Sequence, residues 1–166
     1  MPDKLIERLD AWLAVNRPEY YSALRPGIST NSLDAFDVRF SLTLPESFRK
    51  LYSWRDGQPS NLFESIYENW QFLSLDQITS TKQSLDEMIG TDFDDPKWWR
   101  KSWIPFLANG GGDNLCLDLG VDDQGTPGQL LTFWHDDEER SIDSDSLDSW
   151  LESLVESMER GTLELY

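Results

Sequence analysis

The first third of the chain has hydrophobic residues at helical spacing. One apolar stripe predicts a helix over about residues 3–16, and it consists of Leu5, Ile6, Leu9, Trp12 and Leu13. A short helix over about 19–25 should end at Pro26-Gly27. A third helix can be capped by Thr30 or Asn31 and carries Leu33, Phe36 and Phe40. A fourth begins at Leu44-Pro45 and ends at Asp56-Gly57, with an inward face of Phe48, Leu51 and Tyr52.

The middle of the chain changes to the pattern of strands and tight turns. Residues 70–73 form a first candidate strand, and a helix follows that is marked by Leu75, Ile78, Leu85, Met88 and Ile89. Short apolar runs predict three more strands over about 103–107, 115–119 and 129–134. The first two of these flank Asn109-Gly110-Gly111-Gly112-Asp113, which is typical of a β-hairpin turn.

The order of these elements predicts an α+β fold, with a central, mostly antiparallel sheet flanked by N-terminal and C-terminal helices. The three later strands are too close in sequence for parallel crossovers. A closing helix has an apolar stripe from Leu147 to Met158, ends at Gly161 and can be capped by Asp145 or Ser146. We therefore expect one domain over 1–166, with N-terminal helices over about 1–56, a sheet region over about 70–140 and the closing helix over about 145–160.

Composition adds a strong acidic bias. The 31 Asp and Glu outnumber the 14 Lys and Arg, which gives a net charge of −17. This charge argues against nucleic acid and anionic membranes as partners, because both attract basic residues, and it favours a basic protein. The only cysteine, Cys116, should be a small buried hydrophobe. Because the N-terminus lacks a signal-like apolar stretch, we expect a cytoplasmic protein, and a monomer in the first instance.

No group of residues forms a recognisable catalytic or metal-binding motif. The carboxylates have no spacing that selects an acid/base pair. The candidate calcium ligands miss the spacing of an EF-hand loop; they are Asp113, Asn114, Asp118, Asp122 and Asp123. His135, the only histidine, is better explained as a strand-end residue that pairs with a neighbouring carboxylate. The glycine-rich turn precedes a strand and lacks a lysine, unlike a phosphate-binding loop. We therefore expect no enzyme, no catalytic residues, no bound metal and no cofactor.

Four segments together resemble the SUKH superfamily, the group of the fungal Smi/Knr cell-wall regulators and many bacterial immunity proteins. Residues 44–58 resemble its Leu-Pro, helix, aromatic and Asp-Gly segment, and 103–119 resemble its strand–turn–strand core. Residues 128–136 resemble its next strand, which ends in His-Asp, and 146–154 resemble its closing helix. The resemblance implies an α+β fold without catalytic residues. It implies toxin neutralisation for members of the bacterial type and scaffolding in cell-wall synthesis and signalling for members of the fungal type.

The resemblance and the charge lead to a hypothesis of function. We expect an immunity protein that neutralises a cognate bacterial toxin whose basic, nuclease-type surface an acidic inhibitor can cover. The alternative is an intracellular regulatory scaffold of the cell-wall-assembly-regulator type. A third hypothesis, from the tryptophans and carboxylates, is a protein that binds or hydrolyses carbohydrate.

The candidate partner-binding residues are the acidic turns, together with tryptophans as apolar anchors. They are Asp92, Asp94, Asp95, Trp98, Trp99, Asp122, Asp123, Trp134, Asp136, Asp137, Glu138 and Glu139. Adjacent residues of an extended segment point to opposite sides, so Trp98 and Trp99 should not both face inward. Trp12, Trp103 and Trp150 are expected in the core.

Overall fold

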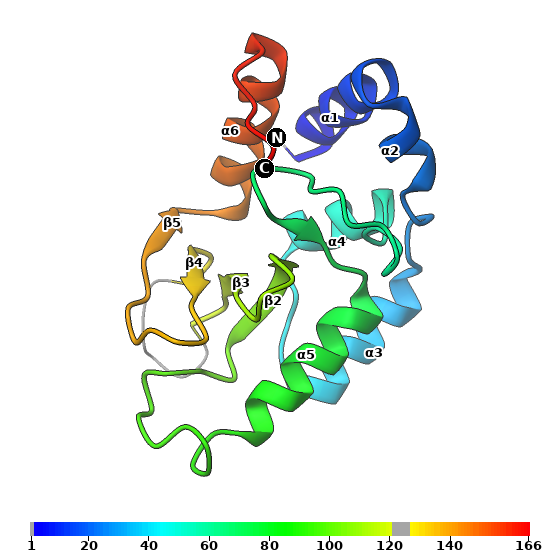
Figure 1. Cartoon of the computed structure of the whole chain (residues 1–166). Coiled ribbons are helices and arrows are strands. Elements are labelled where there is room, and N and C mark those ends of the chain that lie inside the picture. The colour runs from blue at the N-terminus through cyan, green and yellow to red at the C-terminus, as the bar shows by residue number, and fades with distance from the viewer. Residues whose placement is uncertain (1, 121–126) are drawn as a thin grey trace.

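The computed structural model describes residues 2–120 and 127–166, and its centre is an antiparallel sheet with strand order β1-β2-β3-β4-β5 (Figure 1). The strands are β1 (Gln71–Phe72), β2 (Trp103–Ala108), β3 (Asn114–Asp118), β4 (Leu130–Phe133) and β5 (Ile142–Ser144). The predicted α+β class and antiparallel sheet are confirmed. Sequence patterns missed β5, because this short edge strand is largely exposed and has no apolar alternation.

The described residues form six helices, which confirm the sequence-based assignments apart from small shifts at their ends. They are α1 (Pro2–Asn16), α2 (Pro18–Ala23), α3 (Thr30–Phe40), α4 (Glu46–Trp54), α5 (Leu75–Glu87) and α6 (Leu147–Arg160). Ser29 caps α3, so the predicted caps, Thr30 and Asn31, are wrong by one and two residues. Ser146 caps α6, as predicted. None of these helices is long and apolar enough to cross a lipid bilayer. Figure 1 shows α1, α2 and α6 together at one end of the molecule.

The central strands are buried on both faces, which divides the core into two clusters. In β3, Leu115 and Leu117 point into the larger cluster, which the helices cover, while Cys116 between them points into the smaller one. The smaller cluster consists of Trp99, Trp103, Cys116, Leu131 and Phe133. The predicted burial of Cys116 is confirmed, since its side chain is 0% exposed. Both faces therefore need a covering layer of chain.

A buried polar junction follows the end of α4, and Gln58 is its centre. The Gln58 Oε1 atom accepts hydrogen bonds from the Tyr20 hydroxyl (2.7 Å) and the Phe72 amide (3.0 Å). Its Nε2 atom donates to the carbonyls of Leu62 (2.9 Å) and Glu64 (2.7 Å). One side chain thereby connects α2, strand β1 and the loop between α4 and β1.

Asp56 extends the same junction to α5. Its Oδ1 atom accepts a hydrogen bond from the amide of Leu75, the first residue of α5, at 2.7 Å. Arg25 lies 3.5 Å from the other carboxylate oxygen. Burial raises the pKa of Asp56, although the Leu75 amide and Arg25 oppose that shift. The carboxylate thus satisfies one of the unpaired amides at the start of α5.

Gly57 is required between these two polar residues. Its φ angle is +68°, and a Cβ atom there would lie 2.4 Å from backbone atoms of Leu73 and Ser74. We predict that Gly57→Ala lowers the free energy of unfolding by about 3 kcal/mol or more, because left-handed strain adds to a clash with backbone. Urea unfolding followed by tryptophan fluorescence measures this change.

Gly161 supplies a matched control for that substitution. Its φ angle is +73°, but a Cβ atom added there would have no neighbouring atom within 4 Å. Gly161→Ala should therefore cost only the conformational strain, about 1 kcal/mol. Equal losses in the two variants would contradict a packing constraint at Gly57.

Candidate partner-binding site

The segment between α5 and β2, residues 88–102, covers the smaller core cluster. Within it Trp99 is only 1% exposed and packs edge-to-face against Trp103 and Phe133, with ring centroids 5.3 and 5.2 Å apart. Its indole N–H donates to Asp86 at 2.8 Å. The prediction of Trp99 as a surface anchor is therefore wrong, because the side chain holds this cover onto the sheet. Trp98 is only half-buried, and it packs against this cluster together with Phe93.

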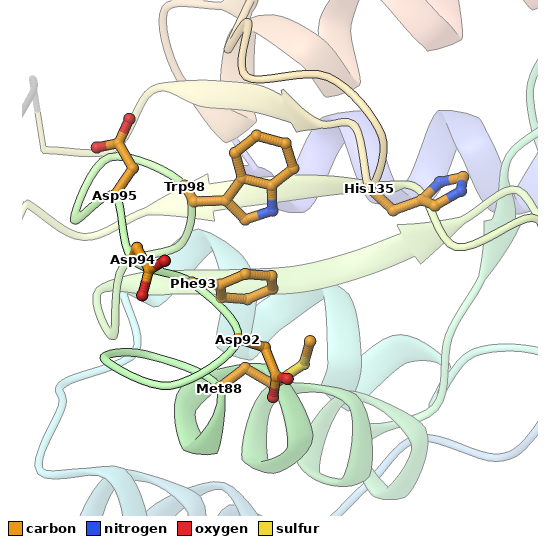
Figure 2. A pocket seen from close by; sticks show the side chains of 7 residues that line it. All are labelled: Met88, Asp92, Phe93, Asp94, Asp95, Trp98 and His135. Atoms are coloured by element: carbon orange, nitrogen blue, oxygen red, sulfur yellow. The ribbon is translucent and has the colours of Figure 1, made fainter.

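A pocket of about 430 Å³ lies on the outer side of this cover. Figure 2 shows the rings of Phe93 and Trp98 side by side, with His135 across from them. The two ring centroids are 6.1 Å apart and the ring planes are inclined by 37°. The full lining is Met88, Asp92, Phe93, Asp94, Asp95, Trp98 and His135. The volume is within the range of about 300–1,000 Å³ that is usual for ligand sites.

The three aspartates at this pocket are exposed and lack basic partners. Ion pairs elsewhere in the described residues, such as Arg49–Asp34 and Lys50–Asp3, do not involve Asp92, Asp94 or Asp95. The Asp95 carboxylate accepts the Lys97 amide at 2.8 Å, which is ordinary turn chemistry. No described basic group therefore lies within ion-pair distance of these carboxylates, although Arg140 interacts electrostatically with Asp95 over a longer distance.

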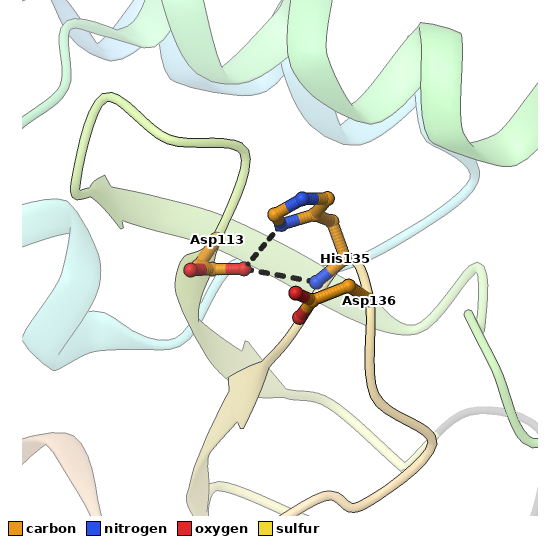
Figure 3. A group of neighbouring side chains, drawn as sticks. All are labelled: Asp113, His135 and Asp136. Atoms are coloured by element: carbon orange, nitrogen blue, oxygen red, sulfur yellow. Dashed lines mark hydrogen bonds and ion pairs between the residues drawn. The ribbon is translucent and has the colours of Figure 1, made fainter.

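His135 lies at the end of β4 and is held by a carboxylate (Figure 3). One oxygen of Asp113 accepts the His135 amide at 2.9 Å and lies 2.8 Å from the ring Nδ1. Asn109 donates to the other oxygen at 2.8 Å. The prediction of a strand-end histidine paired with a carboxylate is confirmed. The partner comes from the β2–β3 turn, whose own hairpin geometry is also as predicted.

This contact shifts two pKa values in opposite directions. The hydrogen bond to Asp113 raises the pKa of His135 above its ordinary value of 6.5. Burial tends to raise the pKa of Asp113, but hydrogen bonds from His135 and Asn109 outweigh it, so the net shift is downward. Both shifts favour a charged pair that joins the turn to the end of β4.

The second acidic turn, Asp136 to Glu139, lies beyond His135 and is fully exposed. Asp136 is beside the His135 ring in Figure 3. Asp137 accepts the Glu139 amide at 2.9 Å, which again is local turn chemistry. The turn thus continues the negative surface away from the pocket, and Asp122 and Asp123 lie outside the described residues.

The tryptophans of the chain are buried or half-buried rather than exposed. Trp134, a predicted anchor, is half-buried, and its ring lies 6.5 Å from the buried Trp70, so it is separate from the pocket. The expected core positions of Trp103 and Trp150 are confirmed, while Trp12 is partly buried against the larger cluster. All eight tryptophans are buried or half-buried. None of them is exposed, and Trp98 is the one whose side chain lines the pocket.

The described residues were also considered as metal ligands and as nucleophiles. Asp113, His135 and Asp136 place ligand atoms within 4.8 Å of one another, yet Asp113 and His135 already bond to each other. We assign no metal to them. Cys116 has no access to solvent, and burial raises the pKa of its thiol far above the ordinary value. A buried neutral thiol is a poor nucleophile.

The site therefore unites one predicted acidic turn with one predicted tryptophan, and adds residues that sequence reasoning missed. Phe93 stands within the acidic segment Thr91 to Lys97, and an aromatic residue among acids was the available signal for it. His135 was interpreted only as structural. Its place opposite Trp98 depends on the β3–β4 pairing, which no local pattern specifies.

Comparison with known proteins identifies the family. The sequence model of the SMI1 / KNR4 family (SUKH-1) matches residues 27–153, which contain all five described strands and the pocket. The chain belongs to the SMI1/KNR4 family. This confirms the resemblance to the SUKH superfamily that the four sequence segments indicated.

Three of the matched relatives are fungal proteins that are named as regulators. The chain is 24% identical to a glucan synthesis regulatory protein of Neurospora crassa, over 93% of this chain and 38% of the relative. It is 24% identical to the cell wall biosynthesis/cell cycle regulator smi1 of Schizosaccharomyces pombe, over 93% and 35%. The cell wall assembly regulator SMI1 of Saccharomyces cerevisiae is 17% identical, over 92% and 39%. The chain thus spans less than two fifths of the length of these curated relatives.

These names favour the regulatory alternative over the immunity hypothesis. None of the matched relatives is named as an immunity protein or paired with a toxin. They are also not named as enzymes.

The His135–Asp113 pair should make the stability of the fold depend on pH. The chain has one histidine, so the pKa of its ring can be measured directly. Because the folded pKa of His135 is raised, its stabilising contribution is complete below pH 6.5 and is lost as pH rises through the folded pKa. NMR titration of the histidine ring should give a pKa above 6.5. Asp113→Asn should return it toward that value, and Asp136→Asn should lower it less. A pKa unchanged by Asp113→Asn would contradict the contact.

The acidic turn Asp136 to Glu139 should be dispensable for folding. Replacement of all four acids by lysine removes one local hydrogen bond and no buried contact, and exposed substitutions usually change stability by only about 0.5 kcal/mol each. Circular dichroism and urea unfolding should therefore match the wild type closely. Loss of the folded state would show that these acids are structural.

Proposed function

We propose that this chain is a non-catalytic regulatory domain that binds a basic segment of a partner protein. The observation that carries the proposal is the pocket at residues 88–98, where three exposed carboxylates that form no ion pair with a described residue lie beside an aromatic pair. A surface that combines exposed carboxylates with half-buried aromatic rings suits recognition of a basic group.

The family relatives support the regulatory part of this proposal. Three of them are named as regulators of glucan synthesis or of cell wall assembly or biosynthesis. These relatives are more than twice as long as this chain. A shared activity or a shared partner is therefore part of our proposal. We propose a partner among the proteins of cell-wall synthesis or signalling.

The charge of the chain supports the basic character of that partner. A net charge of −17 attracts positively charged surfaces and speeds encounter with them. Association should therefore slow strongly as salt is added, since screening shortens the range of the attraction.

Affinity capture tests this proposal in the organism that encodes the chain. The baits are the wild type and a variant with Asp92, Asp94 and Asp95 changed to asparagine, washed at low and high salt. We expect the wild type to recover a cell-wall-synthesis or signalling protein in a salt-sensitive manner, and the variant to recover much less. Equal recovery by both baits would refute the acidic pocket as the binding surface.

An immunity protein is the second candidate, and the acidic charge is the observation that favours it. Carboxylates can cover the phosphate-binding surface of a nuclease toxin. In the same capture experiment this function would yield a secreted basic toxin domain, and added chain would block the activity of that toxin. A gene beside a toxin gene would favour it further, whereas recovery of endogenous cell-wall proteins alone would exclude it.

A further inference from the structure

We infer that the pocket lined by residues 88–98 and His135 receives an arginine side chain of the partner. This deepens, and rests on, the proposed binding of a basic segment. The inference concerns one subsite within that contact, so it can fail while the broader function stands.

The carboxylates at the pocket favour a positively charged ligand. Asp92, Asp94 and Asp95 are exposed at the pocket and form no ion pair with any described residue. The pocket lining contains no lysine or arginine, and its one histidine, His135, is paired with Asp113. An anionic group would be repelled there, and an apolar group would remove carboxylates from water without compensation. A cation is the ligand that the pocket stabilises.

The aromatic rings at the pocket favour a planar cation. Phe93 and Trp98, with centroids 6.1 Å apart, form one side of the pocket, and Figure 2 places both rings toward its interior. Aromatic faces attract cations, and a planar guanidinium can stack on them while its N–H groups reach carboxylates. An ammonium has no plane to stack, so arginine fits the combination of rings and carboxylates better than lysine.

The chain itself shows that Trp98 accepts a guanidinium. The guanidinium carbon of Arg140 lies 5.0 Å from the Trp98 ring centroid and 4.8 Å from that of Phe133. Its Nη2 atom donates to the Trp98 carbonyl at 2.8 Å. Arg140 is not among the residues that line the pocket, although its charge interacts with Asp95.

The test compares two peptides that differ in charge but hardly in shape. Hexa-arginine and hexa-citrulline are titrated into isotope-labelled wild-type protein at physiological ionic strength, and binding is followed by NMR. We expect hexa-arginine to bind and to shift resonances of residues 88–98 and His135 the most. Hexa-citrulline, which lacks the positive charge, should bind about tenfold more weakly or worse. Equal binding of both peptides would overturn the inference.

Matched variants separate the pocket from general attraction between opposite charges. Asp92→Asn, Asp94→Asn and Asp95→Asn together remove three negative charges, and asparagine preserves the turn at Asp95. The control removes three exposed charges from α1, α2 and α6, through Glu7→Gln, Glu19→Gln and Glu152→Gln. We expect the pocket variant to weaken hexa-arginine binding by about tenfold or more, and the control by about twofold at most.

A third variant tests the aromatic side. Phe93→Leu keeps an apolar side chain of similar bulk over the core and removes the ring, so the amide spectrum should report an intact fold. We expect a loss of about threefold to tenfold in affinity for hexa-arginine. Unchanged affinity in this variant, or equal losses in the pocket and control variants, would refute an arginine pocket. Salt-sensitive capture of a basic partner would in that case still support the proposed function.

Discussion

The buried polar junction at residues 56–58 is the constraint on which the rest of the structure depends. Gln58 uses both atoms of its side-chain amide to join α2, the loop after α4 and strand β1. Asp56 ties the same point to the first amide of α5. Because every one of these groups would otherwise be an unsatisfied buried donor or acceptor, the junction specifies one arrangement of its neighbours. Helix α5 then leads directly into the segment that carries the pocket, so the position of the pocket follows from this junction.

A second constraint comes from burial on both faces of the antiparallel sheet. Helices cover one face, while the end of α5 and residues 88–102 cover the other. This segment both fills the core and lines the pocket, and its two adjacent tryptophans have different roles. Trp99 fills the smaller cluster, and Trp98 contributes to the outer pocket and to the contact with Arg140. An interaction surface built on such a cover is held in place by core packing rather than by the loop alone.

Features of the fold could be predicted from the sequence where they depend on residues that are close together along the chain. The stripe Leu5, Leu9 and Leu13 and the Asn109–Asp113 turn are short-range patterns, and both gave the observed element. Strand β5 was missed because its pairing with β4 gives it no buried face of its own. For Trp99, sequence showed that it and Trp98 should not both face inward. Which of them turns inward depends on Trp103 and Phe133, whose positions are set by the sheet.

The same distinction applies to the candidate site. The sequence identifies Asp92, Asp94, Asp95 and Trp98 as chemically suited to a basic partner, since charge and residue type are visible without a structure. It does not place His135 opposite them, because that proximity needs the register in which Asn114 pairs with Phe133. The acidic turn Asp136 to Glu139 was nominated on the same grounds, yet it continues the surface outside the pocket.

Polar residues that hold the fold together are separate from the polar residues at the pocket. Asp56, Gln58 and Asp113 are acceptors or donors within the chain, and changing them disturbs the fold. Asp92 and Asp94 do little for the fold, since their carboxylates are exposed and form no ion pair within the described residues. Substitutions at these positions would change what the pocket attracts while the junction, the hairpin and the sheet stay intact. If the proposed binding at this pocket is correct, replacement of a few carboxylates around the aromatic pair should change partner choice without a change in the architecture that presents them.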